Sequence, residues 1–62
     1  MLIQEFEQRT GYYPSAKEYA VIEQAYYTFD GDKDAFCKAY KGNKDGLAQR
    51  IQRIANAEAA MD

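Results

Sequence analysis

The clearest hydrophobic pattern in the chain lies between residues 15 and 29. Four residues follow one another there at intervals of three and four and so share one helix face, with Val21 and Ala25 at its margin: Tyr19, Ile22, Tyr26 and Phe29. Ser15 is a favourable N-cap, and Glu18 three residues later fits a capping box. We therefore expect a central helix that the rest of the chain packs against.

A shorter pattern precedes this stretch. From residue 2 to residue 10, Leu2, Ile3 and Phe6 can share a face, and Gly11 is a residue type that often ends helices. Tyr12, Tyr13 and Pro14 then make a bend. The first helix is thus expected to be short.

Two further helices are expected after the central one. In the first, from about residue 33 to residue 41, the core-facing positions are Phe36, Ala39 and Tyr40, with Cys37 at their edge. Asp32 would cap this helix, and Asn43 would cap the next. The last helix, from about residue 44 to residue 59, places five apolar residues on one face: Leu47, Ala48, Ile51, Ile54 and Ala55.

The alternating acidic residues that start at Asp30 are also the way a calcium-binding loop begins. Such a loop needs glycine at its sixth position and glutamate at its twelfth, where this chain has Ala35 and Lys41. Helix breaking at Gly31 and capping by Asp32 explain the segment better.

Together these patterns predict an all-α fold, a compact bundle of three main helices preceded by a short N-terminal helix. The chain has 62 residues, which suits one small domain over residues 1–62 with a limited core. No apolar run reaches the length of a membrane span, and the lone Cys37 suits a reducing compartment. We therefore expect a cytoplasmic protein with no membrane contact.

Charge is distributed unevenly along the chain. The net charge is -2, but residues 1 to 32 hold six acidic and two basic side chains, whereas residues 33 to 56 hold six basic and two acidic ones. The two parts therefore carry -4 and +4. Each part could meet a partner, or the two could attract each other.

The basic part of the chain suggests nucleic acid as a partner. The polar face of the last helix is rich in side chains that match base edges, and lysines that suit phosphate contacts come just before it. The residues of this hypothesis are Lys38, Lys41, Lys44, Gln49, Arg50, Gln52, Arg53 and Asn56. A solvated helix face needs the same residue types, and the negative net charge argues against a dedicated DNA-binding domain.

The acidic part suggests a protein partner instead. The chain has six tyrosines, more than a small core requires, and tyrosine is favoured at protein interfaces. The docking surface of this hypothesis consists of Glu5, Glu7, Tyr12, Tyr13, Glu23 and Tyr27. The same surface could serve a homodimer, or these tyrosines could pack over the short first helix.

Residue types argue against catalysis. The chain has no histidine, so a serine or cysteine nucleophile would lack its usual base, and we expect Cys37 to fall inside a helix. No cysteine and histidine cluster suits a metal, and the four glycines do not form a phosphate loop. We expect no catalytic residues, no metal and no cofactor.

The runs EFEQRTGYYPS, EYAVIEQAYYTF and DGDKDAFCKAYKGNKDGLAQRIQ resemble small uncharacterised proteins carried by phages and conjugative elements of gut Firmicutes, over residues 5 to 53. That family has no settled activity, so the resemblance transfers no site residue. It implies a setting in which accessory proteins help a mobile element regulate itself or counter host defence. The leading hypothesis is a non-enzymatic interaction protein, and the alternative is a helix-turn-helix-like nucleic-acid binder.

Overall fold

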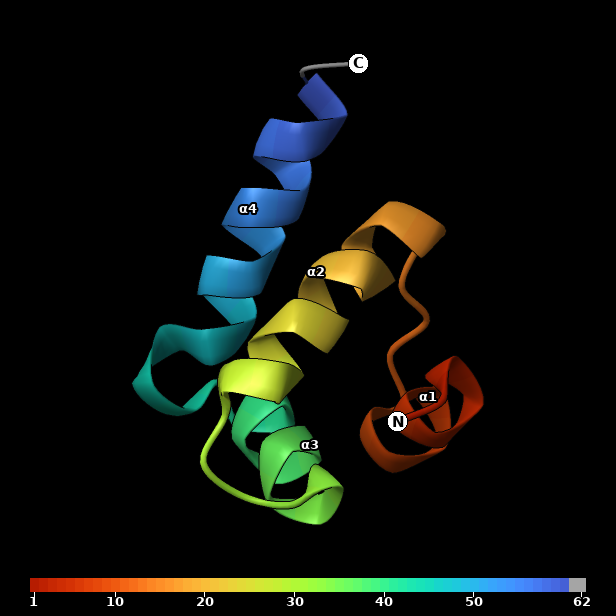
Figure 1. Cartoon of the computed structure of the whole chain (residues 1–62), viewed down its shortest axis with the longest axis vertical. Helices are drawn as coiled ribbons and strands as arrows, with labels where there is room; N and C mark the ends of the chain where they lie inside the picture. The colour runs from red at the N-terminus through yellow and green to blue at the C-terminus, as the bar shows by residue number, and fades with distance from the viewer. Residues whose placement is uncertain (61–62) are drawn as a thin grey trace.

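The computed structural model describes residues 1–60, and every regular element in that range is helical (Figure 1). The elements are α1 (Ile3–Thr10), α2 (Ala16–Thr28), α3 (Lys33–Lys41), a 3-10 turn η1 (Lys44–Gly46) and α4 (Leu47–Ala60). The all-α prediction is confirmed. By length the helices form two pairs, with α2 and α4 long and α1 and α3 short.

The predicted starts of α2 and α3 are set by side-chain caps. The Ser15 hydroxyl accepts from the Glu18 amide at 3.2 Å, and the Asp32 carboxylate accepts from the Ala35 amide at 2.8 Å. The Glu18 carboxylate does not complete a capping box, because it accepts from the Gln52 side chain of α4 at 3.4 Å. A tertiary contact thus replaces the expected local one.

The last helix begins three residues later than predicted. Asn43, Asp45 and Gly46 have φ values of 52°, 56° and 71°, which are left-handed and incompatible with an α-helix. The chain forms the short turn η1 there and enters α4 only at Leu47. Asn43 still acts as a cap across this turn, since its side-chain oxygen accepts from the amides of Ala48 and Gln49 at 3.0 and 3.3 Å.

The helices pack in two main pairs. α2 lies beside α4 and runs in the opposite direction, and α1 packs against α3 (Figure 1). Each helix contributes one of the four largest fully buried side chains: Phe6, Ile22, Phe36 and Ile51. One core therefore joins both pairs.

Aromatic rings build much of this core. The Phe6 ring lies edge-on to Tyr40 and Tyr19, with centroids 5.0 and 6.1 Å away. Phe36 meets Tyr26 and Phe29 in the same manner, at 5.4 and 5.3 Å. Edge-to-face pairs of this kind add to the free energy gained from burial alone.

Several predicted core assignments need correction. Cys37, expected at an edge, is buried, and its sulfur lies 3.8 Å from the Met1 sulfur. Val21 is buried as well, because α4 covers the flank of α2 on which it lies. Leu2 and Ile54, expected in the core, keep 64% and 47% of their surface exposed. Leu2 precedes the first turn of α1, and Ile54 lies on the rim of a groove.

Two ion pairs fasten α1 to the first turn of α3. Arg9 pairs with Asp34, and Lys33 pairs with Glu5. The bond from Lys33, followed by the one from the Leu2 amide, lowers the pKa of the Glu5 carboxyl below its ordinary value. Within residues 1–60, no helix is both long and apolar enough to cross a bilayer.

Candidate interaction surfaces

The five basic residues between positions 38 and 53 form no ion pair within residues 1–60. All are exposed: Lys38, Lys41, Lys44, Arg50 and Arg53. The pairs Glu5–Lys33 and Arg9–Asp34 each remove one charge of either sign. The separation between an acidic and a basic part of the chain therefore persists in the folded protein.

The side chains predicted to read bases do not lie on a single face of α4. Gln49, Arg53 and Asn56 are exposed on the outer side of the helix. Arg50 is turned to one flank, where it lines a groove against α2. Gln52 is turned to the opposite flank, where it donates to the Tyr12 hydroxyl and the Glu18 carboxylate.

The predicted tyrosine and carboxylate surface divides into two places. One part gathers around the Tyr19 hydroxyl. This hydroxyl interacts electrostatically with the Glu23 and Glu5 carboxylates and with Tyr27. Desolvation first, and these neighbours next, raise the pKa of Tyr19 to about 12. We call Glu5, Glu23 and Tyr27 the acidic tyrosine patch.

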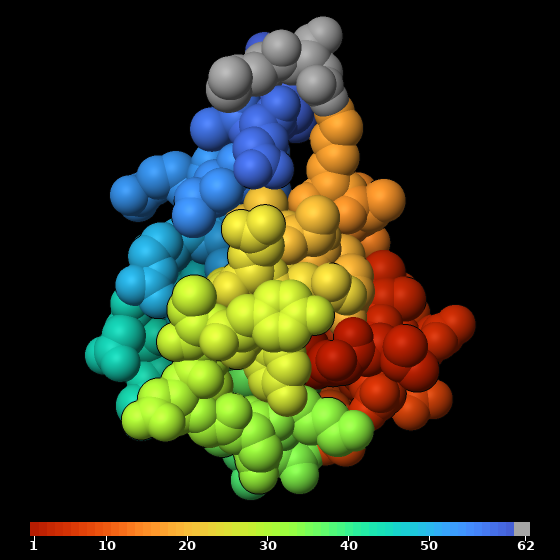
Figure 2. Space-filling model, in the orientation of Figure 1, coloured from red at the N-terminus to blue at the C-terminus, as the bar shows by residue number. Residues whose placement is uncertain are grey.

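Tyr27 is the prominent side chain of this patch, with 78% of its surface exposed. Glu23 lies one helical turn before it on α2, so the two share a face. The ring of the half-buried Tyr26 lies beside the Tyr27 ring in a tilted arrangement, with their centroids 6.3 Å apart. In Figure 2 this half of α2 occupies the middle of the molecule's face, between α1 and α4.

Tyr12 lies elsewhere. Its ring packs edge-on against Tyr40, at 5.7 Å, and its hydroxyl accepts from Gln52. Burial, followed by the Glu18 charge, raises the pKa of Tyr12. Tyr13, its neighbour in sequence, is 76% exposed, and Glu7 is half-buried on α1. Tyr12 therefore joins the polar flank of α4, apart from the acidic tyrosine patch.

A small cleft of about 310 Å³ opens beside Tyr12. Residues from both predicted sets meet in it, because Lys41, Gln49 and Gln52 line it together with Tyr12. The sequence assigned the first three to nucleic acid and the last to a protein interface. Only the tertiary fold brings them together.

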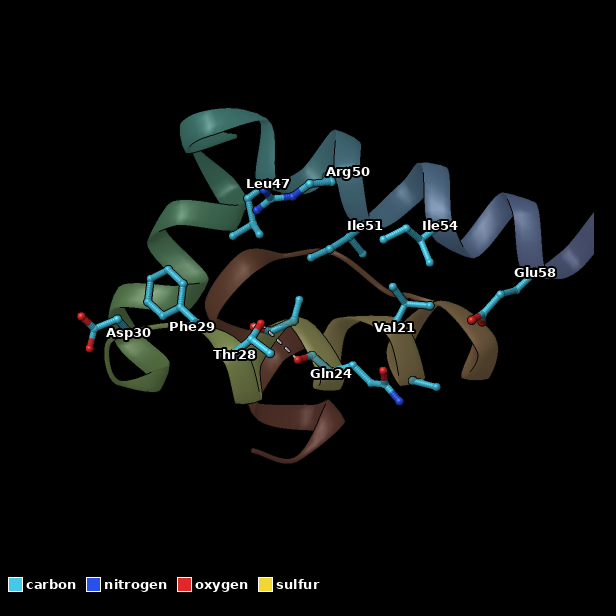
Figure 3. Close-up of a pocket in the computed structure, with 12 residues that line it drawn as sticks. Val21, Gln24, Thr28, Phe29, Asp30, Leu47, Arg50, Ile51, Ile54 and Glu58 are labelled. Carbon is cyan, nitrogen blue, oxygen red and sulfur yellow. Dashed lines mark hydrogen bonds between the residues drawn. The ribbon is translucent and has the colours of Figure 1, made fainter.

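A larger groove, which the hydrophobic pattern of the sequence did not predict, lies between α2 and α4. It has a volume of about 780 Å³, with Val21, Ala25 and Ile51 among its apolar lining residues. Arg50, Ile54 and Glu58 project from α4 along it (Figure 3). The sequence feature that could have revealed this groove is the regular spacing of four residues between Arg50, Ile54 and Glu58.

Cys37 lies within α3, as the sequence predicted. Cys37 is buried, and desolvation raises the pKa of its thiol, which disfavours the nucleophilic thiolate. Within residues 1–60, no three cysteine, aspartate or glutamate side chains are grouped so that they could hold a metal ion.

Comparison with known proteins adds no relative. No protein-family model, no curated protein and no solved structure matches the chain.

Proposed function

We propose that this protein is a non-enzymatic interaction protein, a compact helical bundle that docks on a protein partner in the cytoplasm. The observation that carries the proposal is the acidic tyrosine patch, where the exposed Tyr27 ring stands one helical turn from the Glu23 carboxylate. Glu23 has no ion pair within residues 1–60, and Tyr27 is among the most exposed large side chains there.

The chemistry of the patch favours a cationic segment of the partner. An arginine side chain can stack on the exposed face of Tyr27 while its guanidinium pairs with the Glu23 carboxylate one turn away. A partner with an arginine-rich segment therefore fits the patch better than an acidic or purely apolar one.

Binding of a fluorescein-labelled oligoarginine peptide, followed by anisotropy, tests this proposal. The variant Tyr27→Ala/Glu23→Gln should bind the peptide roughly tenfold more weakly than the unaltered chain. The matched control Tyr13→Ala/Asp30→Asn removes the same groups from exposed positions outside the patch and should bind as the unaltered chain does. Equal losses in both variants would mean that only net charge attracts the peptide, and the proposed patch would be wrong.

Nucleic-acid binding is the second candidate, and the five basic residues that form no ion pair within residues 1–60 favour it. Lys38, Lys41 and Lys44 precede α4 and could contact phosphates, with Arg53 and Gln49 on the outer face of the helix. Gln52 and Arg50 contribute less than the sequence suggested, since one is hydrogen-bonded within the protein and the other faces the groove.

Anisotropy of labelled duplex DNA at low and at physiological salt tests this candidate. Phosphate contacts predict binding that weakens steeply as salt rises and that is reduced in the Arg50→Ala/Arg53→Ala variant, chiefly through the loss of Arg53 on the outer face of α4. Absence of binding at low salt would exclude it. A mobile-element setting for either function remains part of the proposal and depends on the sequence resemblance alone.

A further inference from the structure

One side of the groove between α2 and α4 carries charged residues in a self-complementary order, and the proposed peptide docking uses none of these residues. Arg50, Ile54 and Glu58 succeed one another at intervals of four residues on α4, and all three are exposed and line the groove. Ile54 is the middle residue, with a positive charge one turn before it and a negative charge one turn after it. We call these three residues the α4 strip.

The α4 strip is complementary to its own reversed copy. If two α4 helices lie antiparallel with Ile54 facing Ile54, Arg50 of each chain faces Glu58 of the other, because both lie four residues from the centre. With a rise of about 1.5 Å per residue, each charged residue lies about 6 Å from the two-fold axis along the helix. A two-fold interface pairs residues in this reciprocal way.

The surroundings suit this arrangement. Ile54 leaves 47% of its surface exposed at the rim of a groove with an apolar floor. A partner side chain placed in the groove would therefore cover the exposed part of Ile54 and the apolar floor together. Ala20 of α2 also lines the groove and is small enough to allow a helix to approach closely. Asp30, the remaining charged lining residue, lies beyond Phe29 at the end of the groove remote from Ile54 (Figure 3).

We propose that the occupant of this groove is a second copy of the chain, which forms a two-fold dimer through antiparallel α4 strips. The proposal does not depend on the acidic tyrosine patch, which has separate residues. A physical reason also favours it. A chain of 62 residues buries a smaller fraction of its surface than a larger domain does, and dimerisation would cover apolar area that the monomer leaves exposed.

Charge exchange across the two-fold axis provides the test. Arg50→Glu creates a chain with glutamate at both ends of the strip, and Glu58→Arg creates one with arginine at both ends. Each single variant should repel its own copy, and a mixture of the two should form a heterodimer in which both contacts are attractive. The double variant Arg50→Glu/Glu58→Arg restores opposite charges and should dimerise as the unaltered chain does.

Sedimentation velocity of the full chain over a concentration series, up to about 1 mM, measures these equilibria. Each single variant should dimerise roughly tenfold more weakly than the unaltered chain, because symmetry makes every exchanged charge act twice. Arg53→Glu, an equal charge change on the outer face of α4, is the control and should leave the dimer intact. Circular dichroism checks that every variant is folded.

A monomeric unaltered chain at the highest concentration would overturn the proposal. So would a dimer that Arg50→Glu leaves unchanged, since its interface would lie elsewhere. A mixture of the two single variants that associates no better than either alone would equally exclude the antiparallel arrangement.

Discussion

The hydroxyl of Tyr19 on α2 donates a hydrogen bond of 2.8 Å to the backbone carbonyl oxygen of Met1. Tyr19 retains only 8% of its surface exposed, and Met1 packs against the core. This bond links the start of the chain to the central helix. It also lies beneath the acidic tyrosine patch, so the position of α1 and the shape of that surface are coupled.

Removing this hydroxyl should destabilise the protein at neutral pH. A partly buried hydrogen bond contributes about 1 kcal/mol to the free energy of unfolding. For Tyr19→Phe we therefore expect Tm to fall by about 4–8 °C in a thermal melt followed by circular dichroism. Tyr27→Phe, which removes an exposed hydroxyl from the same helix, is the control. An unchanged Tm for Tyr19→Phe would show that the Met1 contact does not form in solution.

Alkaline pH should weaken the fold through the same side chain. The pKa of Tyr19 is raised from 10.0 to about 12, so the folded state holds a proton that the unfolded state loses first. The stabilisation is complete below pH 10 and is lost as pH rises toward 12. Equilibrium unfolding in urea at several pH values should show this loss. It should be smaller in Tyr19→Phe, and an equal loss in both chains would contradict the assignment.

Phe6 should be indispensable although α1 is short. Its side chain is fully buried and meets Tyr19 and Tyr40. Phe6→Ala leaves a cavity that costs about 3–5 kcal/mol, which rivals the whole stability of a domain of this size. We expect a largely unfolded circular dichroism spectrum at 25 °C. Leu2→Ala, at an exposed position of the same segment, should melt like the unaltered chain. Similar losses in both would mean that α1 packs differently.

Acid should weaken the contact between α1 and α3. Because its folded-state pKa is lowered, Glu5 stabilises the protein above its ordinary value of 4.5, and this contribution is lost as pH falls through the folded-state pKa. Glu5→Gln should therefore lower Tm at pH 7 and have a smaller effect at low pH, where the carboxyl of the unaltered chain is protonated too. A difference in Tm that does not depend on pH would exclude the Lys33 pair as its cause.

Asn43 has two separable roles, one from its side chain and one from its backbone. The side-chain oxygen accepts from two amides of α4, and the residue has a φ of 52°. Asn43→Asp keeps the acceptor, Asn43→Gly keeps only the tolerance for positive φ, and Asn43→Ala loses both. Stability measured by urea unfolding should decrease in that order, with Asn43→Ala losing about 2 kcal/mol. Equal stability of the glycine and alanine variants would contradict the backbone role.

Much of the architecture followed from local chemistry. The periodicity around Ile22 and the caps at Ser15 and Asp32 predicted the helical character of the chain and the positions of α2 and α3 to within a residue or two. Helical periodicity and N-caps depend on residues that are close together in the chain, so the sequence is sufficient to predict them. The delayed start of α4 was missed because Asp45 and Asn43 are left-handed, a conformation that non-glycine residues rarely adopt.

The surfaces were harder to predict. The sequence placed Tyr12 with Tyr27 and placed Gln52 with Arg50, whereas the structure sets Tyr12 against Gln52 and turns Arg50 into the α2–α4 groove. Periodicity assigns a residue to a helix face, but it does not say which neighbouring helix that face will meet. Ile54 shows the same limit, since it belongs to the apolar side of α4 and is nevertheless left exposed.

The sequence by itself determined the helices, the caps that begin two of them and the separation of acidic from basic residues, because each depends on local geometry or composition. Only the tertiary structure decided that α2 pairs with α4 and α1 with α3. That pairing buries Cys37, gathers the acidic tyrosine patch around Tyr19 and leaves the groove open. These outcomes depend on contacts between residues far apart in the chain, where the packing of one helix fixes what its neighbour can cover.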